Sequence, residues 1–188
     1  IHENLYKIDS RIVISPNFDE IYDNLAIARS EGTASVKSYL DTDIAEGLRG
    51  GERVILKMHG SVSRPNDLIF TRSEYAKARS THRGFYSLIE SLLRTHTFLF
   101  IGCGLSDPDI RLLLEDYSYS FIHSRKHFFT IPISELGPVS AQTVENSLGI
   151  NFLRYSPKNG HQDLTESLGL LQSLVEQKRG EMADSQSW

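Results

Sequence analysis

Three short apolar segments of the chain are each followed by a polar, turn-forming loop whose residues could take part in chemistry. The loops comprise residues 16–19, 59–61 and 102–108. In open parallel α/β sheets, ligands bind outside the carboxyl ends of the strands, where such loops lie side by side. The three loops together therefore predict one ligand pocket at the strand ends of an α/β sheet.

In the first loop, Asn17 and Asp19 stand where a helix is predicted to begin. Free backbone N–H groups and the positive end of the helix dipole meet a ligand at such a point. Asn and Asp are also preferred helix caps, so a purely structural interpretation stays open. The two roles can coincide, because helix N-termini favour anions.

In the second loop, His59 follows an apolar strand and precedes Gly60. An imidazole at this point can accept a proton near neutral pH, and a glycine beside it lets the backbone turn tightly or a ligand approach closely. The alternative is a histidine that serves only as a structural donor in the turn. No two of the seven histidines have the spacing of metal ligands, so we predict no metal site.

In the third loop, Gly102 and Gly104 stand at a strand end, and Asp107 and Pro108 open the next predicted helix. The arrangement is similar to a shortened dinucleotide turn, in which a helix N-terminus faces phosphate or ribose. A tight turn with Asp107 as N-cap and Pro108 at the first helical position is an equal alternative. We interpret Cys103 as a small buried apolar residue, because no adjacent base is evident.

The elements that position these loops alternate between strand and helix. The first helix carries Phe18, Ile21, Tyr22 and Leu25 at the spacing of one apolar stripe. Near-continuous apolar strands between helices indicate a parallel sheet covered by helices on both faces. We expect strands over residues 11–15, 34–40, 53–58, 97–101, 128–133 and 151–155, with a short extended piece at 68–70. We expect helices at about 19–32, 41–48, 71–80, 84–95, 107–117, 141–148 and 164–175.

Composition narrows the class of protein. At 188 residues the chain suffices for one domain with a proper core. Its net charge of −4 and pI near 6.0 predict no direct nucleic-acid binding. The apolar runs are shorter than the roughly 20 residues that cross a bilayer, and a single cysteine excludes an internal disulfide. We expect a soluble, cytoplasmic protein without a membrane partner.

Taken in order, the motifs resemble the SIR2-like domain family, the sirtuin-related modules of bacterial NAD-consuming defence proteins. The resemblance covers about residues 11–175 and implies a Rossmann-like three-layer parallel sheet with helices on both faces, of class α/β. The segments that carry it are Asn17-Phe18-Asp19, His59-Gly60, Gly102-Cys-Gly-Leu-Ser-Asp-Pro-Asp109, Leu68-Ile-Phe-Thr-Arg-Ser-Glu-Tyr75, Asn151-Phe-Leu-Arg-Tyr155 and His161-Gln-Asp-Leu164.

The resemblance implies an NAD glycohydrolase that cleaves the bond between nicotinamide and ribose, with NAD as substrate and no metal. Asn17 would hold a water or a ribose hydroxyl at the anomeric carbon, His59 would be the general base, and Asp19 would help to fix the nicotinamide ribose. Positive charge builds on the ribose, as in glycoside hydrolysis. The implied cofactor-binding residues are Gly60, Gly102, Gly104, Ser106, Asp107 and Asp109.

Two departures from the family pattern qualify this interpretation. The family begins with a Gly-rich strand and loop that cradle the dinucleotide phosphates, and nothing before Arg11 can play that part. We therefore expect residues 1–179 to be the carboxyl-terminal part of such a domain, residues 180–188 to be a polar tail or linker, and this chain alone to show little or no turnover. Ser15-Pro16 also replaces the residues that usually precede the catalytic Asn.

The alternatives are a non-catalytic module that senses NAD or ADP-ribose or serves in assembly, and an NAD-dependent protein deacylase. Deacylating sirtuins carry a four-cysteine zinc module between the His-Gly and Gly-Ser motifs. The interval from Gly60 to Gly102 contains no cysteine, which disfavours the deacylase. As partners we expect further domains of the same protein or partner defence subunits, in a homo-oligomer.

Overall fold

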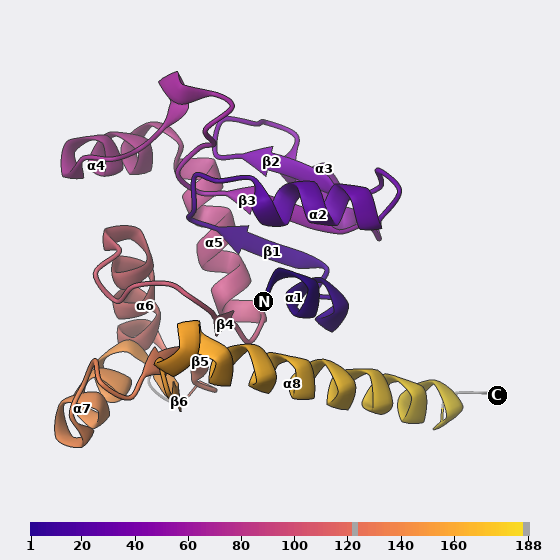
Figure 1. Cartoon of the computed structure of the whole chain (residues 1–188). Helices are drawn as coiled ribbons and strands as arrows, with labels where there is room; N and C mark the ends of the chain where they lie inside the picture. Colours follow the sequence, from indigo (N-terminus) through magenta and orange to yellow (C-terminus); the bar gives the residue numbers. More distant parts are fainter. Residues whose placement is uncertain (122–123, 186–188) are drawn as a thin grey trace. The chain divides into compact units, whose positions relative to one another are not determined.

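The computed structural model describes residues 1–121 and 124–185. It divides into two compact units, the first formed by Ile1–Leu68 and the chain from Lys158 onward, the second by Ile69–Pro157. Each unit has its own three-stranded parallel sheet (Figure 1). The parallel sheets and their flanking helices confirm the predicted α/β class and Rossmann-like fold.

The first unit has the sheet order β1-β3-β2, with all three strands parallel. All four residues of the central strand β3 are buried. A Val-Ile-Leu run buried on both faces is typical of a parallel sheet, and Ile55 packs with Ala26 and Ala34 in the core. The elements are α1 (His2–Ile8), β1 (Ile12–Ser15), α2 (Ile21–Arg29), β2 (Ser35–Ser38), α3 (Ile44–Arg49), β3 (Val54–Lys57), the 3-10 helix η1 (Pro65–Asp67) and α8 (Lys158–Ser185).

Helix α2 is confirmed, and Tyr22 of the apolar stripe predicted for it packs against the core, but the prediction is wrong for Ile21. Ile21 is 59% exposed, whereas Asp23 and Ala26 are buried. The ammonium of Lys57 lies 3.0 Å from the carboxylate of Asp23. This partner offsets the cost of burying the aspartate, and the face that carries Asp23 therefore turns inward.

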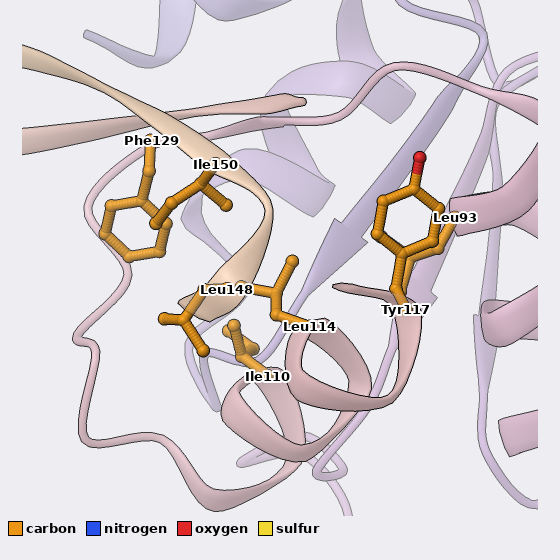
Figure 2. Packing of buried hydrophobic residues seen from close by; sticks show 7 residues of the cluster. All are labelled: Leu93, Ile110, Leu114, Tyr117, Phe129, Leu148 and Ile150. Carbon is orange, nitrogen blue, oxygen red and sulfur yellow. The ribbon is translucent and has the colours of Figure 1, made fainter. Parts of the chain in front are cut away.

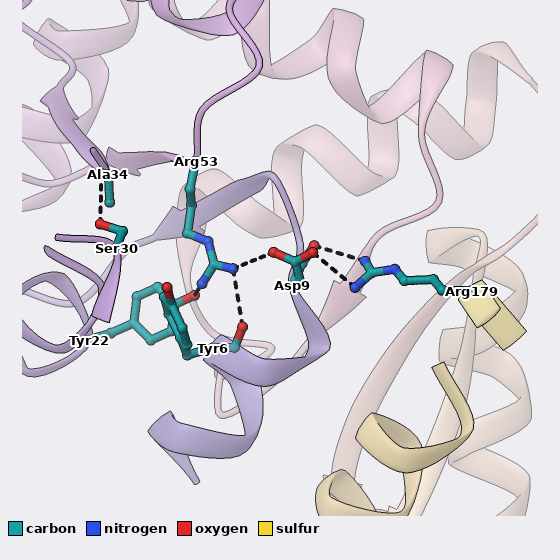
Figure 3. A network of polar contacts seen from close by, with 7 residues as sticks. All are labelled: Tyr6, Asp9, Tyr22, Ser30, Ala34, Arg53 and Arg179. Carbon is teal, nitrogen blue, oxygen red and sulfur yellow. Dashed lines mark hydrogen bonds and ion pairs between the residues drawn. The ribbon is translucent and has the colours of Figure 1, made fainter. Parts of the chain in front are cut away.

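Arg53 ties the helices of the first unit together (Figure 3). Its guanidinium donates to the carbonyl of Tyr6 at 3.1 Å, to Asp9 at 2.7 Å and to the hydroxyl of Tyr22 at 3.3 Å. It also lies 4.0 Å from the centre of the Tyr6 ring. Asp9 accepts a further bond from Arg179 of α8 at 3.0 Å. The network joins α1, α2 and α8 to the residue before β3, although α1 is absent from the sequence prediction.

The second unit has the sheet order β4-β5-β6, also parallel. Its core joins the sheet to three helices, and Figure 2 shows the packed side chains. The elements are α4 (Arg72–Thr81), α5 (Arg83–Thr95), β4 (Leu99–Phe100), α6 (Pro108–Ser120), β5 (His127–Pro132), α7 (Pro138–Leu148) and β6 (Ile150–Tyr155). The buried cluster comprises Leu93, Ile110, Leu114, Tyr117, Phe129, Leu148 and Ile150.

Several predicted boundaries differ from the structure. The strand expected over 97–101 is only Leu99–Phe100, and the piece expected at 68–70 forms no strand. Helix α8 continues through residues 180–185 of the predicted tail, whereas 186–188 lie outside the described residues. The partial domain over 1–179 stays a prediction. Within the described ranges, no helix combines the length and apolar character needed to cross a membrane.

Candidate functional site

Two of the three predicted loops follow neighbouring strands of the first unit. In the parallel pair formed by β1 and β3, Ser15 stands opposite Lys57, so both strands end at the same level. The loop that carries Asn17 and the loop that begins with His59 therefore start side by side at the carboxyl edge of this sheet. This is the edge at which α/β sheets bind their ligands.

Backbone carbonyls on both sides of Asn17 accept hydrogen bonds from the segment that follows β3. The carbonyl of Pro16 accepts from Nδ1 of His59 at 3.2 Å. The carbonyl of Phe18 accepts from the backbone N–H of Val62 at 2.9 Å. Asn17 itself is exposed. The loop is thus fixed through its neighbours, and the amide of Asn17 stays available for a ligand.

His59 is 1% exposed, and its hydrogen bond defines the tautomer of the neutral ring. A carbonyl oxygen only accepts hydrogen bonds, so Nδ1 must carry the proton that bonds to Pro16. In the neutral ring Nε2 then holds the lone pair. Nε2 is consequently the nitrogen that can accept a proton, which a general base requires.

Gly60 is required by the turn itself. Its φ is +85°, and an added Cβ would clash with the carbonyl oxygen of Asp67 and lie 3.0 Å from the carbonyl carbon. A positive φ and a close backbone approach both favour glycine. The backbone of Asp67 therefore explains this glycine without a ligand, and the predicted cofactor contact of Gly60 stays a prediction.

Asp19 lies one residue before the N-cap position of α2 and makes a local hydrogen bond to the start of that helix. Its Oδ1 accepts from the backbone N–H of Ile21 in the first turn of α2 at 3.0 Å. The side chain is nevertheless exposed at the carboxyl edge of the sheet. This hydrogen bond and a contact with a ligand are compatible for Asp19.

Sequence reasoning missed a buried polar group beneath the Asn17 loop. Lys57, at the end of β3, is 2% exposed, and its Nζ donates to the carbonyl of Asp19 at 2.6 Å. It also forms the ion pair with Asp23, which is 4% exposed. Burial raises the pKa of Asp23, and Lys57 opposes that rise. A lysine within an otherwise apolar strand was the available signal, because a charge is rarely buried unless it is paired.

Glu20 is a second group that the sequence prediction omitted. It occupies the N-cap position of α2, and its carboxylate accepts a short hydrogen bond from Oγ of Ser61. Hydrogen bonds from Ser61 and Ser63 lower the pKa of Glu20, and the charge of Lys57 acts in the same direction. A further link thus joins the first loop to the second.

The third predicted loop belongs to the second unit. Asp107 caps α6, because its Oδ1 accepts from the backbone N–H groups of Asp109 and Ile110, both at 3.0 Å. Gly102 has a φ of +66°, and Ser106 is exposed. The capped turn expected as the structural alternative is present, and the helix N-terminus is satisfied by its own aspartate.

The buried side chain of Asp109 makes contacts within the second unit. It is 1% exposed, pairs with the guanidinium of Arg79 and accepts from the hydroxyl of Tyr86 at 2.9 Å. These bonds connect α4 and α5 to α6. Cys103 packs against the core of this unit, and burial raises its pKa to about 11. A thiol with this pKa is a poor nucleophile near neutral pH.

The predicted site residues are therefore divided between the two units. The first unit brings Asn17, Asp19, His59 and Gly60 to one sheet edge. The second unit carries Gly102, Gly104, Ser106, Asp107 and Asp109. Across residues 1–121 and 124–185, no group of three or more His, Cys, Asp or Glu side chains is arranged to hold a metal ion.

The chain belongs to the SIR2-like domain family, because the sequence model of that family matches residues 11–153. This match confirms the resemblance inferred from the motifs. It covers both strand-end loops of the first unit and the capped turn of the second.

The chain is also similar to characterised relatives. It is 26% identical over 128 residues to the NAD(+) hydrolase ThsA of Acinetobacter baumannii (strain 532279), an alignment that covers 67% of this chain and 27% of the relative. It is 26% identical over 137 residues to NAD(+) hydrolase ThsA of Bacillus cereus (strain MSX-D12), covering 71% of this chain and 29% of the relative. It is 25% identical over 117 residues to Defense-associated sirtuin 2 of Bacillus subtilis, covering 61% and 11%. The chain thus spans less than a third of each relative.

Proposed function

We propose that this chain supplies part of the catalytic centre of an NAD glycohydrolase, which cleaves NAD to nicotinamide and ADP-ribose within a larger antiphage defence protein. One observation carries the proposal: hydrogen bonds from His59 and Val62 hold the loop around Asn17 from both sides. An exposed amide and a proton-accepting imidazole are thereby fixed on adjacent strand ends. The names of the relatives support NAD as the substrate.

In the proposed reaction, water attacks the anomeric carbon of the nicotinamide ribose. The bond from that carbon to the nicotinamide nitrogen breaks, and its electron pair leaves with neutral nicotinamide. Asn17 orients the water or a ribose hydroxyl, because an amide both donates and accepts hydrogen bonds. Nε2 of His59 accepts the proton that the nucleophile releases. The carboxylate of Asp19 supports the positive charge that builds on the ribose.

For the second unit by itself, the family resemblance implies nucleotide contacts from Gly102, Gly104 and Ser106. Asp107 holds this turn in shape through its capping bonds. Asp109 acts by anchoring α6. The full-length protein works in the cytoplasm as a homo-oligomer, together with further domains or partner defence subunits.

The test uses the full-length protein that carries this chain. Nicotinamide and ADP-ribose are quantified by liquid chromatography for the natural protein and for Asn17→Ala, His59→Ala and the double variant. Loss of an orienting amide or a general base lowers turnover by about 100-fold or more. Asn24→Ala and His96→Ala are matched controls at exposed positions and keep the natural rate. Undiminished nicotinamide release by the double variant would contradict the proposal.

The second candidate is a module that binds NAD or ADP-ribose without turnover. The burial of His59 favours it, because a buried imidazole also serves as a structural donor. Calorimetry on the full-length protein separates the two functions. Binding of NAD without nicotinamide release supports the non-catalytic module, whereas rapid NAD consumption excludes it. A deacylase would instead require an acyl-lysine peptide for nicotinamide release, and we expect no such stimulation.

A further inference from the structure

Lys57 occupies an unusual position for a charged residue. It is the last residue of the central strand β3, two positions before His59, and it is 2% exposed. Burial of an ammonium group is costly unless it is paired and hydrogen-bonded. Its two partners are the carboxylate of Asp23 at 3.0 Å and the backbone carbonyl of Asp19 at 2.6 Å.

The second partner distinguishes this ion pair from one that only stabilises the core. Asp19 and its carbonyl belong to the loop that carries Asn17, whereas Asp23 belongs to the first turn of α2. A single ammonium group therefore connects the end of β3 both to the loop and to the helix that follows the loop. Apolar side chains of similar size could fill the same volume, but they could not bind the carbonyl of Asp19.

We propose that Lys57, held by Asp23, is a positioning residue that fixes the Asn17 loop relative to His59. This inference rests on the proposed function and identifies how Asn17 and His59 are kept in position relative to each other. His59 binds the loop at Pro16, before Asn17, and Lys57 binds it at Asp19, after Asn17. Val62 also binds the loop at Phe18, so loss of the Lys57 bond removes one of several attachments after Asn17. The loop then loosens at Asp19, while the strand that carries His59 stays in place.

The test separates positioning from stability by exchanging the ion pair for an apolar pair. The double variant Lys57→Met, Asp23→Leu removes both buried charges and keeps the site filled, a type of exchange that is often neutral or stabilising. The control is Lys37→Met, on the adjacent strand β2, whose ammonium pairs with the 61% exposed carboxylate of Asp43. Full-length proteins are compared in kcat and KM for NAD, in thermal midpoint, and in backbone amide exchange over residues 17–20.

The double variant is expected to keep its thermal midpoint and KM, to lose at least about tenfold in kcat, and to exchange the amides of residues 17–20 faster. The Lys37→Met control changes none of these quantities. An active natural protein whose double variant keeps its kcat within twofold overturns the inference. An inactive natural protein contradicts the proposed function instead, and amide exchange then tests the inference about Lys57. Faster exchange in the double variant supports positioning of the loop by Lys57, and unchanged exchange overturns the inference.

The single variant Asp23→Asn covers the case in which the double variant does not fold. It preserves the shape of the site but leaves the Lys57 ammonium without its counter-charge, which weakens the hold on Asp19. We expect kcat to fall about fivefold with KM unchanged and the amide exchange of residues 17–20 to rise. Natural kcat together with natural exchange in a folded Asp23→Asn variant overturns the inference.

Discussion

Replacement of Gly60 by alanine tests whether the turn between β3 and η1 depends on the absence of a side chain. Two costs apply at this position. A φ of +85° costs an alanine about 1–2 kcal/mol. The new Cβ also meets the backbone of Asp67 and lies 3.3 Å from Cα of Leu68, and overpacking of this kind costs about 1–3 kcal/mol.

The chain offers a close control in Gly32. Its φ is +84°, but nothing lies within 4 Å of an added Cβ. Gly32→Ala therefore carries only the backbone cost of about 1–2 kcal/mol, and Gly60→Ala a total of about 2–5 kcal/mol. Movement of Asp67 away from the new methyl group would also strain the bond that its carbonyl accepts from the hydroxyl of Tyr39 at 2.9 Å.

Urea unfolding followed by far-ultraviolet circular dichroism measures both variants. We expect Gly60→Ala to lower the free energy of unfolding by about 1–3 kcal/mol more than Gly32→Ala does, with equal urea dependence. Equal losses for the two variants would refute the reasoning, because they would show that contact with Asp67 contributes nothing.

Three further predictions concern buried groups of the second unit. Burial lowers the pKa of His127, so the unfolded chain binds a proton at this imidazole more readily than the folded chain does. The free energy of unfolding therefore falls as the pH drops below about 6.5. Thermal midpoints from pH 8 to 5 should fall more steeply in the natural chain than in His127→Phe, and equal slopes would contradict this prediction. Cys103 is partly buried, and its pKa is raised to about 11. It should therefore react with iodoacetamide at pH 8 far more slowly in the folded chain than in urea, and equal rates by mass spectrometry would contradict this prediction. Tyr86→Phe removes a hydrogen bond to the buried carboxylate of Asp109 and should cost about 1.5–3 kcal/mol in urea unfolding, whereas a Tyr119→Phe control, 87% exposed, should cost almost nothing.

The sequence predicts best those elements in which local and tertiary preferences agree. The Val-Ile-Leu run of β3 is apolar and begins with two β-branched residues, and it forms the buried central strand as expected. Asp107 followed by Pro108 predicts the start of α6, and the structure shows both the capping bonds and the proline at the first position. Such patterns are local, so they can be found without knowledge of the partners.

The failures arise where a distant partner decides the outcome. The inward face of α2 depends on the ammonium of Lys57, which lies 34 positions from Asp23 in the sequence and forms the ion pair only in the fold. The two-residue length of β4 follows from its register, because only Leu99 and Phe100 pair with β5. Apolar character alone could not show where that pairing ends.

For the candidate site, the sequence identifies the site residues better than it predicts the role of each residue. Asn17 and His59 follow adjacent parallel strands, as the motif order suggests. The contacts that hold the Asn17 loop also involve Lys57 and Glu20, to which the sequence analysis assigned no role. Asp109 shows the converse: a residue within a family-like segment is buried against Arg79 and Tyr86.

The central claim is that Asn17 and His59 act together on NAD. Single-turnover release of nicotinamide by the full-length protein, compared among Asn17→Ala, His59→Ala and the double variant, tests it most directly. Groups that act as one unit are strongly non-additive, so we predict that each single variant loses about as much rate as the double variant. Release at the natural rate by the double variant, or losses that simply multiply, would contradict the claim that the two residues form one catalytic centre.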